Sequence, residues 1–373
     1  MRRLNIVFYA PFKPLDHPDP SGDRVIGAGL YRFLESRGHR LQIASRLRCR
    51  WIYWKPWRWP LVAVERRRIR RRFSSRRADL WLTYHSYYKG PDLLGPGVAG
   101  RLDIPYVIFQ GAYATKYRRN WRTRPGFELN RHALKAAGHV FANKKVDLVN
   151  LQRLLPDESL DYVAPGIDPE AFPRDPEAGG CLRRKWRAGE APVLLTAAMF
   201  RPGVKVQSLE WVIRACGRLQ RDFRLVIVGD GRERARLEAL AAERLSGKAV
   251  FAGRIPREEM YRYYSAADLF VFPGIGESLG MVFLEAQCCG LPVVACRTAG
   301  VPEVVADAVT GFLTPIDDLA SFTGAVEKLL ADDDLRTGMG RAARQYVLET
   351  HDLNKNYGRV EDRLMGVVKR HRA

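Results

Sequence analysis

Two glutamates, Glu277 and Glu285, stand eight residues apart around a glycine in the stretch GESLGMVFLEAQCCGLP at 276–292. The apolar run 269–273 predicts a strand, a helix is predicted from Gly280, and 293–296 predicts the next strand. A helix N-terminus after a strand binds anions, because its free N–H groups and its dipole face the ligand. Carboxylates beside it do not bind phosphate but accept hydrogen bonds from sugar hydroxyls. The pattern predicts a site for a phosphate flanked by hydroxylated rings, as in a nucleotide sugar.

This stretch resembles the E-x(7)-E signature of the retaining glycosyltransferases of family 4. The similarity extends over 162–350 and includes, at the family's spacing, APGIDPEAF (164–172), VGDGRERARLEAL (228–240), FAGRIPREEMYRYYSAADLFVFP (251–273) and AGVPEVVADAVTGFLTP (299–315). The resemblance implies an α/β chain of GT-B architecture, in which two Rossmann-like, doubly wound parallel-sheet domains face each other across a cleft. Without it, both glutamates can be ordinary surface carboxylates of another doubly wound domain.

The resemblance also implies roles for individual residues. Glu285 is expected to hold the ribose hydroxyls, and Glu277 to contact the sugar and steady positive charge at its anomeric carbon. The remaining expected donor contacts are Ser278, Leu279, Gly280, Met281, Val282, Arg254, Ile255, Gly229 and Gly22. Gly22 stands alone where the family carries a paired-glycine loop, so an ordinary turn is the alternative there.

The chain departs from the family after the predicted strand at 193–197. Family members carry a Gly-Arg pair there and a lysine shortly afterwards, both directed at the diphosphate. Lys205 matches the lysine, but 198–200 reads Ala-Met-Phe and Arg201 is displaced. We expect Lys205 and Arg201 to meet the phosphate charge together, since a long planar guanidinium tolerates a short change in the loop. The alternative for Arg201 is a solvated turn residue.

A second departure concerns the acceptor side. Gln110, before Gly111, occupies the position of a family histidine, and glutamine cannot act as a general base at neutral pH. His85, at the end of the preceding predicted strand, covers part of that role or is merely structural. No D-x-D follows a strand, and the acidic run 332–334 predicts a helix cap. We therefore expect no metal and no cofactor beyond the donor, a UDP-sugar in preference to a GDP-sugar.

Charge is concentrated in the first half of the chain. Residues 1–185 hold 36 Lys and Arg against 17 Asp and Glu, whereas residues 186–373 hold 26 against 24. Segment 46–77 carries thirteen basic residues and one acid. A segment with this much positive charge usually indicates that the protein binds an anionic partner. The residues expected at that surface are Trp51, Trp54, Trp57, Trp59, Arg66, Arg67, Arg68, Arg70, Arg71 and Arg72.

Three interpretations of segment 46–77 compete. It can be a solvated basic face with packed tryptophans, or a nucleic-acid surface on which bases stack. We favour an anionic membrane surface, because tryptophan suits the headgroup level and clustered arginine suits acidic lipids. Val62, Ile69 and Phe73 form a thin apolar stripe, which predicts surface binding rather than deep insertion. No nucleic-acid module accompanies the segment, so we expect no nucleic-acid partner.

The predicted organisation has three parts. Residues 1–165 form an acceptor-side domain, 166–350 a nucleotide-sugar domain, and 351–373 a helix that, by the resemblance, crosses back to the first domain. No apolar run reaches 18 residues, and the six cysteines show no metal spacing. We expect a cytoplasmic enzyme, peripherally bound to the inner face of the membrane, with a glycan or lipid-linked acceptor such as a lipopolysaccharide core or a polyprenyl-linked sugar. The alternatives are a soluble acceptor, a nucleotide-sugar epimerase and an inactive nucleotide-sugar-binding protein.

Overall fold

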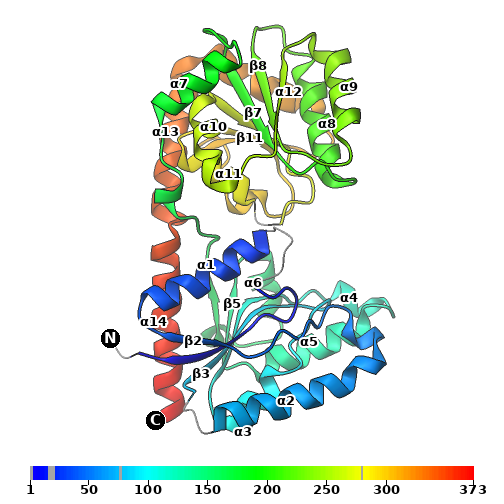
Figure 1. Ribbon diagram of the computed structural model, residues 1–373, viewed down its shortest axis with the longest axis vertical. Coiled ribbons are helices and arrows are strands. Elements are labelled where there is room, and N and C mark those ends of the chain that lie inside the picture. Colours follow the sequence, from blue (N-terminus) through cyan, green and yellow to red (C-terminus); the bar gives the residue numbers. More distant parts are fainter. Residues whose placement is uncertain (1–2, 16–21, 75–77, 279) are drawn as a thin grey trace. The chain divides into compact units, whose positions relative to one another are not determined.

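The computed structural model describes residues 3–15, 22–74, 78–278 and 280–373. The chain forms two compact units: unit 1 comprises Met1–Ala164 and Asn354–Ala373, and unit 2 comprises Pro165–Leu353. Within the described residues, each unit contains one six-stranded, all-parallel sheet with helices on both faces (Figure 1). The predicted α/β class, with two doubly wound parallel-sheet units, is therefore confirmed.

The sheet of unit 1 has the order β2-β1-β3-β4-β5-β6. Its strands are β1 Asn5–Tyr9, β2 Arg40–Ile43, β3 Leu80–Ser86, β4 Tyr106–Gly111, β5 His139–Ala142 and β6 Leu160–Tyr162. The central strands β3 and β4 are buried almost throughout. Their near-continuous apolar runs fit a parallel sheet that is covered on both faces.

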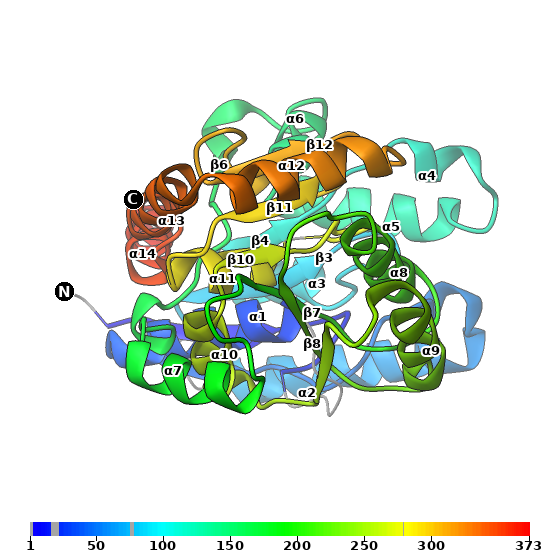
Figure 2. The same cartoon turned by 90° about the horizontal axis from the view of Figure 1, so that it is seen from above.

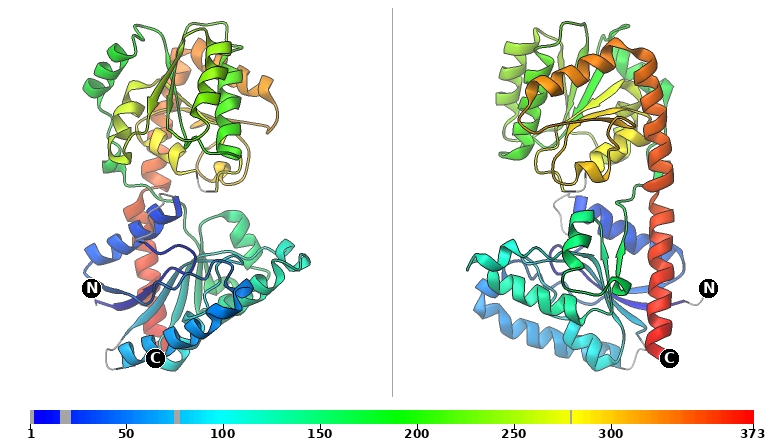
Figure 3. Two further views of the ribbon diagram at one scale, coloured as in Figure 1. Left: turned by 45° about the vertical axis from the view of Figure 1, so that its right-hand side comes forward. Right: turned by 180° about the vertical axis from the view of Figure 1, so that it is seen from behind.

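The helices of unit 1 cover both faces of this sheet (Figure 3). They are α1 Gly22–Ser36, α2 Trp59–Ser74, α3 Gly95–Leu102, α4 Lys116–Arg119, α5 Arg124–Ala136, α6 Lys145–Leu151 and α14 Leu353–Arg372, with short 3₁₀ turns η1 Ile52–Trp54, η2 Pro56–Arg58 and η3 Asp157–Ser159. α2, α3 and α5 share one core with the side chains of Val7 and Trp81. Phe8 and Phe109 point to the other face, where their rings meet Tyr31 of α1 and Tyr357 of α14.

α14 attaches to unit 1 by apolar and ionic contacts. The hydroxyl of Tyr357 donates to the carbonyl of Ile26 at 3.1 Å, and its ring lies 5.7 Å from that of Phe33. The buried Glu361 accepts from Arg37 at 2.9 Å and pairs with His39 at 3.2 Å. Removal of either partner would leave the buried charge of Glu361 incompletely paired, which destabilises the folded unit. The last helix is therefore an integral part of unit 1.

The sheet of unit 2 has the order β12-β11-β10-β7-β8-β9. Its strands are β7 Val193–Ala197, β8 Arg224–Val228, β9 Ala249–Gly253, β10 Leu269–Val271, β11 Val293–Cys296 and β12 Gly311–Thr314. The strands predicted at 193–197 and 293–296 are thus confirmed, and that predicted at 269–273 ends two residues earlier.

The helices of unit 2 lie on both faces of this sheet (Figure 2). They are α7 Pro176–Lys185, α8 Val204–Cys216, α9 Arg234–Leu245, α10 Met260–Ala266, α11 Met281–Cys288, α12 Leu319–Ala331 and α13 Asp333–Thr350, with 3₁₀ turns η4 Pro169–Ala171, η5 Arg257–Glu259 and η6 Val301–Glu303. Asp332 caps α13, its carboxylate accepting from the N–H of Leu335 at 2.8 Å. The predicted cap is confirmed.

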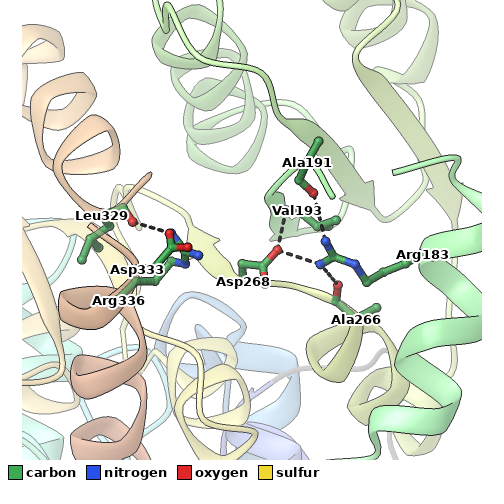
Figure 4. Close-up of polar contacts among 8 residues, drawn as sticks. All are labelled: Arg183, Ala191, Val193, Ala266, Asp268, Leu329, Asp333 and Arg336. Atoms are coloured by element: carbon green, nitrogen blue, oxygen red, sulfur yellow. Dashed lines mark hydrogen bonds and ion pairs between the residues drawn. The ribbon is translucent and has the colours of Figure 1, made fainter. Parts of the chain in front are cut away.

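Arg183 of α7 fixes the starts of two strands in unit 2. Its guanidinium donates to Asp268 at 2.7 Å and to the carbonyl of Ala191 at 3.0 Å, and Asp268 also accepts from the N–H of Val193 at 2.7 Å (Figure 4). Asp268 precedes β10 and Val193 begins β7, so one ionic contact sets the register of the two central strands. The site described next lies at the opposite, carboxyl end of those strands, where ligands of parallel α/β sheets collect.

Candidate functional site

The loop between β10 and α11 is shaped by glycines. Gly274, Gly276 and Gly280 all have positive φ, between 63° and 72°. At Gly280, the N-cap of α11, an added Cβ would lie 2.8 Å from side-chain atoms of both Phe283 and Val304. Because left-handed backbone and tight packing coincide there, only glycine fits without a shift of its neighbours. The helix predicted from Gly280 is confirmed, with Gly280 as its cap.

The start of α11 offers backbone donors. The first N–H groups of an α-helix have no partner within the helix. In α11 these belong to Met281 and Val282, since the N–H of Phe283 donates to the carbonyl of Gly280 at 2.9 Å. Ser278 precedes this turn, and Leu279, also expected to contact the donor, lies outside the described residues. An anion at this point would meet the positive end of the helix dipole and these two N–H groups, for which no acceptor is found among the residues that the structure describes.

Glu277 on this loop forms an ion pair with Lys205 from the first turn of α8. The side chains of both residues are about four-fifths buried, with 19% of Lys205 and 18% of Glu277 exposed. The ammonium also lies 5.4 Å from the ring centroid of the buried Phe272. The structure therefore brings together the two side chains that the sequence assigns to the sugar and to the phosphate.

Two contacts hold the backbone of the Glu277 loop. The carbonyl of Glu277 accepts from the N–H of Gly300 at 2.9 Å, and the N–H of Ile275 donates to the hydroxyl of Ser208 at 3.3 Å. Gly300 belongs to the AGVPE stretch and Ser208 to α8. Contacts from two other segments of unit 2 thus hold the loop that carries Glu277.

Glu285 lies in α11 and is buried, with 11% of its side chain exposed. One carboxylate oxygen accepts from Nε of Arg257 at 2.7 Å, and the other accepts from the hydroxyl of Tyr264 at 3.1 Å. Burial raises the pKa of Glu285, while the charge and hydrogen bond of Arg257 and the hydrogen bond of Tyr264 lower it. Arg257 and Tyr264 were not predicted as site residues, although Arg257 stands three residues after Arg254 in the GRIPREEM stretch.

The loop after β7, where the family's Gly-Arg pair is missing, packs against the loop after β8. Phe200 is fully buried, and its backbone bonds to Asp230 and Glu233. An added Cβ on Gly229, with φ of 141°, would come within 1.9 Å of the carbonyl of Ala198. The loops after β7 and β8 therefore pack tightly against each other, with the buried Phe200 and Gly229 at their contact.

Arg201 is exposed and makes no side-chain hydrogen bond or ion pair with any described residue. Arg254 is likewise exposed, directly after β9, and Ile255 packs partly against the core. Of the two side chains predicted to bind phosphate, Lys205 is held by its ion pair with Glu277, whereas Arg201 is exposed to solvent. Gly22 begins α1 of unit 1.

The predicted acceptor-side residues lie at the carboxyl ends of β3 and β4. His85 and Gln110 both have left-handed backbone, with φ of 57° and 64°. Such backbone in residues other than glycine stores strain and clusters at functional sites. The His85 ring stacks on Tyr87, with centroids 4.6 Å apart, and Gln110 is buried. At Gly111 an added Cβ would meet Val140 at 2.5 Å, so its lack of a side chain serves packing.

Segment 46–77 divides into structural and exposed residues. The apolar stripe Val62, Ile69 and Phe73 is buried in the core of unit 1, so its interpretation as a membrane-facing stripe is wrong. Arg66 donates to the carbonyl of Leu93 through Nε at 2.8 Å, and Arg70 donates to the carbonyl of Arg66 at 3.2 Å. Arg66 thus ties α2 to the segment before α3, whereas the Arg70 bond lies within α2, and both side chains are partly buried.

Other members of the segment are exposed. Trp57 is 70% exposed and Val64 is 59% exposed, while Trp51 is half-buried. The remaining exposed predicted residues are Trp54, Trp59, Arg67, Arg68, Arg71 and Arg72. Trp121, which was not predicted, is 68% exposed and packs edge-on against Trp54 with ring centroids 5.6 Å apart. Trp121 stands in the basic stretch RRNWRTR, whose mixture of arginine and tryptophan resembles that of segment 46–77. This stretch was the sequence signal from which Trp121 could have been predicted.

An open pocket of about 520 Å³ lies beside Trp121 and is lined by Lys116, Arg119, Asn120, Trp121 and Arg122. We call the exposed Trp and Arg residues of 54–72, together with 116–122, the basic aromatic surface. Within the described residues, no helix has the length and apolar character needed to cross a membrane. In the same part of the chain, no three His, Cys, Asp or Glu side chains gather as metal ligands.

Comparison with known proteins supports this architecture. Residues 183–346 match the family model for glycosyl transferases group 1. A GDP-mannose-dependent alpha-(1-6)-phosphatidylinositol monomannoside mannosyltransferase of Mycolicibacterium smegmatis is 34% identical over 222 residues, which cover 57% of this chain and 57% of that protein. The chain thus spans a little over half the length of the curated relatives that it matches first.

Two solved structures resemble nearly the whole chain. Anabaena HepE in complex with UDP gives a TM-score of 0.77 at 16% identity, covering 97% of this chain and 100% of that one. WaaG, a glycosyltransferase involved in lipopolysaccharide biosynthesis, gives 0.67 at 20% identity, covering 96% and 100%. At such identities the likeness establishes the fold alone. The chain has the GT-B fold of two Rossmann-like α/β units.

Proposed function

We propose that this chain is a glycosyltransferase that moves a hexosyl group from a nucleotide-sugar donor to a glycolipid or glycan acceptor. The observation that carries the proposal is the pairing of Lys205 with Glu277 on the loop before α11. A fixed cation beside a helix N-terminus suits a diphosphate, and a carboxylate next to it suits the hydroxyls of the attached sugar. The site lies within residues 183–346, which match the glycosyl transferases group 1 model.

The donor is proposed to be a UDP- or GDP-sugar. HepE was crystallised with UDP, and the M. smegmatis relative uses GDP-mannose, so both bases have support among similar proteins. Glu285 is proposed to accept from the ribose hydroxyls, and Met281 and Val282 to donate to the distal phosphate. Arg254 and Ile255, beside β9, are proposed to flank the base, with Gly229 behind the nucleotide.

The proposed reaction retains the anomeric configuration. The acceptor hydroxyl attacks on the face from which the diphosphate leaves, and its proton passes to the leaving phosphate oxygen. Lys205 has three N–H donors, so it can hold both Glu277 and the leaving phosphate as charge develops there. Glu277 faces the opposite charge, the positive one that grows at the anomeric carbon. No step requires a metal ion or a protein general base.

We expect the purified chain, given a UDP- or GDP-hexose and a membrane-glycolipid extract, to form a glycoside with the donor's anomeric configuration. NMR of the anomeric proton reports the configuration, and the reaction should proceed in EDTA. An inverted product would contradict the retaining mechanism, and activity restored only by a divalent ion would contradict metal independence. Interconversion of nucleotide sugars without glycoside formation would identify an epimerase. Donor binding without any turnover would identify an inactive binding protein.

We also propose that the basic aromatic surface binds anionic lipid at the inner face of the cytoplasmic membrane. Exposed tryptophans flanked by arginines combine an interfacial anchor with attraction to acidic headgroups. Trp121 beside Trp54 extends this surface beyond the segment predicted from the sequence. A lipid-linked acceptor at that interface would be presented to unit 1, which carries His85, Gln110 and Gly111.

Replacing the four exposed arginines Arg67, Arg68, Arg71 and Arg72 with glutamine should release the protein from phosphatidylglycerol vesicles in a cosedimentation assay. Each basic side chain at such a surface contributes about 1 kcal/mol, so affinity should fall several hundredfold. The matched control replaces four exposed arginines of unit 2, Arg214, Arg218, Arg221 and Arg244, and should bind almost as wild type. Equal binding of the wild type to neutral vesicles, or equal losses in both variants, would contradict a localised lipid surface.

A further inference from the structure

The side chain of Arg257 is held in place from two directions. Its Nε donates to Glu285 at 2.7 Å, and its guanidinium carbon lies 4.9 Å from the ring centroid of Phe172. Phe172 is 1% exposed, so its ring is a fixed surface against which the guanidinium packs. Of the Arg257 side chain, 42% is exposed, so the guanidinium borders solvent while its Nε reaches a buried partner.

The contacts of Glu285 leave a defined set of acceptor positions. An ionised carboxylate has about four lone-pair sites, two on each oxygen. Arg257 takes one on the first oxygen and Tyr264 takes one on the second. One site on each oxygen remains, which matches two hydroxyls on adjacent carbons, such as those of a ribose. The orientation of the carboxylate, and with it the direction of these two sites, is held by Arg257 and Tyr264 together.

Arg257 also influences the protonation state of Glu285. Burial alone favours the protonated acid and raises its pKa, and the positive charge of Arg257 is the largest influence that opposes it. Burial and the negative charge of Glu285 raise the pKa of Tyr264 well above its usual range, so Tyr264 remains a neutral donor and cannot replace that charge. Without Arg257, the carboxyl would hold its proton to higher pH and would lose acceptor capacity.

We propose that Arg257 is a positioning residue of the donor site, which acts through Glu285 to keep two carboxylate lone pairs directed at a vicinal diol of the nucleotide. This inference rests on the proposed function, because it takes the nucleotide ribose as the ligand of Glu285. It assigns a role to a residue outside the E-x(7)-E pattern, and it predicts that removal of the arginine adds a pH dependence to the affinity for nucleotide.

The experiment is calorimetric titration of the full chain with UDP, GDP and ADP from pH 6 to 9. The wild type should bind one of them, and each variant is compared with it at the same pH, because the terminal phosphate of the nucleotide itself titrates near pH 6. Relative to the wild type, Arg257→Met should bind about tenfold or more weakly at the acid end of the range, and the difference should narrow as the pH rises and Glu285 loses its proton. Arg257→Lys keeps the charge, so its profile should run parallel to that of the wild type, with a loss of a few-fold for the missing planar contact.

Two controls separate action through Glu285 from a general effect. Arg262→Met removes another exposed arginine of the same region, whose Nε donates to the hydroxyl of Tyr261 at 3.2 Å and not to Glu285, and it should bind as wild type. In a Glu285→Gln background, Arg257→Met should add no pH dependence, since no carboxyl remains to titrate. Thermal melts of each variant confirm that the fold is retained.

The outcomes are distinct. Equal affinity of Arg257→Met and the wild type at every pH would overturn the inference, as would a pH-dependent difference between Arg257→Met and its parent that persists in the Glu285→Gln background. Equal, pH-independent losses in Arg257→Met and Arg257→Lys would also overturn it, because they would indicate a direct contact of the arginine with ligand. Failure of the wild type to bind any of the three nucleotides would overturn the proposed function, and this inference with it.

Discussion

Replacing Glu277 with glutamine should reduce glycosyl transfer by about 10²- to 10³-fold while the fold remains intact, the range seen when one preorganised charge-stabilising group is removed. Glutamine keeps the size and a hydrogen-bonding oxygen but removes the negative charge that we propose faces the anomeric carbon. The change also frees Lys205 from its ion pair. Substrate binding should suffer less than turnover, since the charge at the anomeric carbon grows only in the transition state.

The measurement is kcat and KM for the donor, with a thermal melt to verify folding. Glu243→Gln is the matched control, because it makes the same exchange on the exposed face of α9 in the same unit. The control should show wild-type kinetics. Turnover of Glu277→Gln within a few-fold of the wild type would remove Glu277 from the site.

Replacing Lys205 with methionine should have an effect of similar size, about 10²-fold or more on kcat/KM. The substitution keeps the unbranched apolar stem that covers Phe272 but removes the cation. Two consequences follow: the diphosphate loses its anchored positive partner, and Glu277 is left as a partly buried carboxylate without its counter-ion. The affinity for UDP or GDP should fall together with turnover, which distinguishes this variant from Glu277→Gln.

Lys248→Met provides a closely matched control. Nζ of Lys248 lies 5.0 Å from the ring centroid of Phe223, much as Nζ of Lys205 lies 5.4 Å from that of Phe272. Lys248, however, lies at the edge of unit 2, beside β9. Its replacement removes a cation–π contact of the same kind without touching the loop before α11. Equal losses in the two variants would mean that the lysine acts through packing and not through the phosphate.

Short-range patterns predicted much of unit 2. The run 293–296, the glycine at 280 and the acid at 332 are local signals, since strand alternation, left-handed backbone and helix capping depend on neighbouring residues. They led to β11, the start of α11 and the cap of α13. The ion pair of Lys205 with Glu277 was not predicted, because the two residues are 72 positions apart. The resemblance only assigned each of them separately to the donor site.

Long-range packing accounts for what the sequence did not reveal. Val62, Ile69 and Phe73 look like one face of an amphipathic helix, and whether that face meets lipid or protein depends on β1, β3 and α3, which no local pattern links to α2. Arg66 belongs to an arginine-rich run, yet it is fastened to the carbonyl of Leu93. Arg257 became a candidate only when the fold placed η5 against α11.

The course of the chain through unit 1 has a consequence for biosynthesis. Unit 2 is one uninterrupted stretch, Pro165–Leu353, whereas unit 1 needs Asn354–Ala373 as well. During translation, the sheet of unit 1 leaves the ribosome before unit 2, but the surface around Phe33 and Phe109, together with His39, meets Tyr357 and Glu361 only after unit 2 has been made. Domains fold as units when their sequence is complete. The nascent first half therefore waits with an uncovered apolar face while the second half, made later, is the first able to reach its native state.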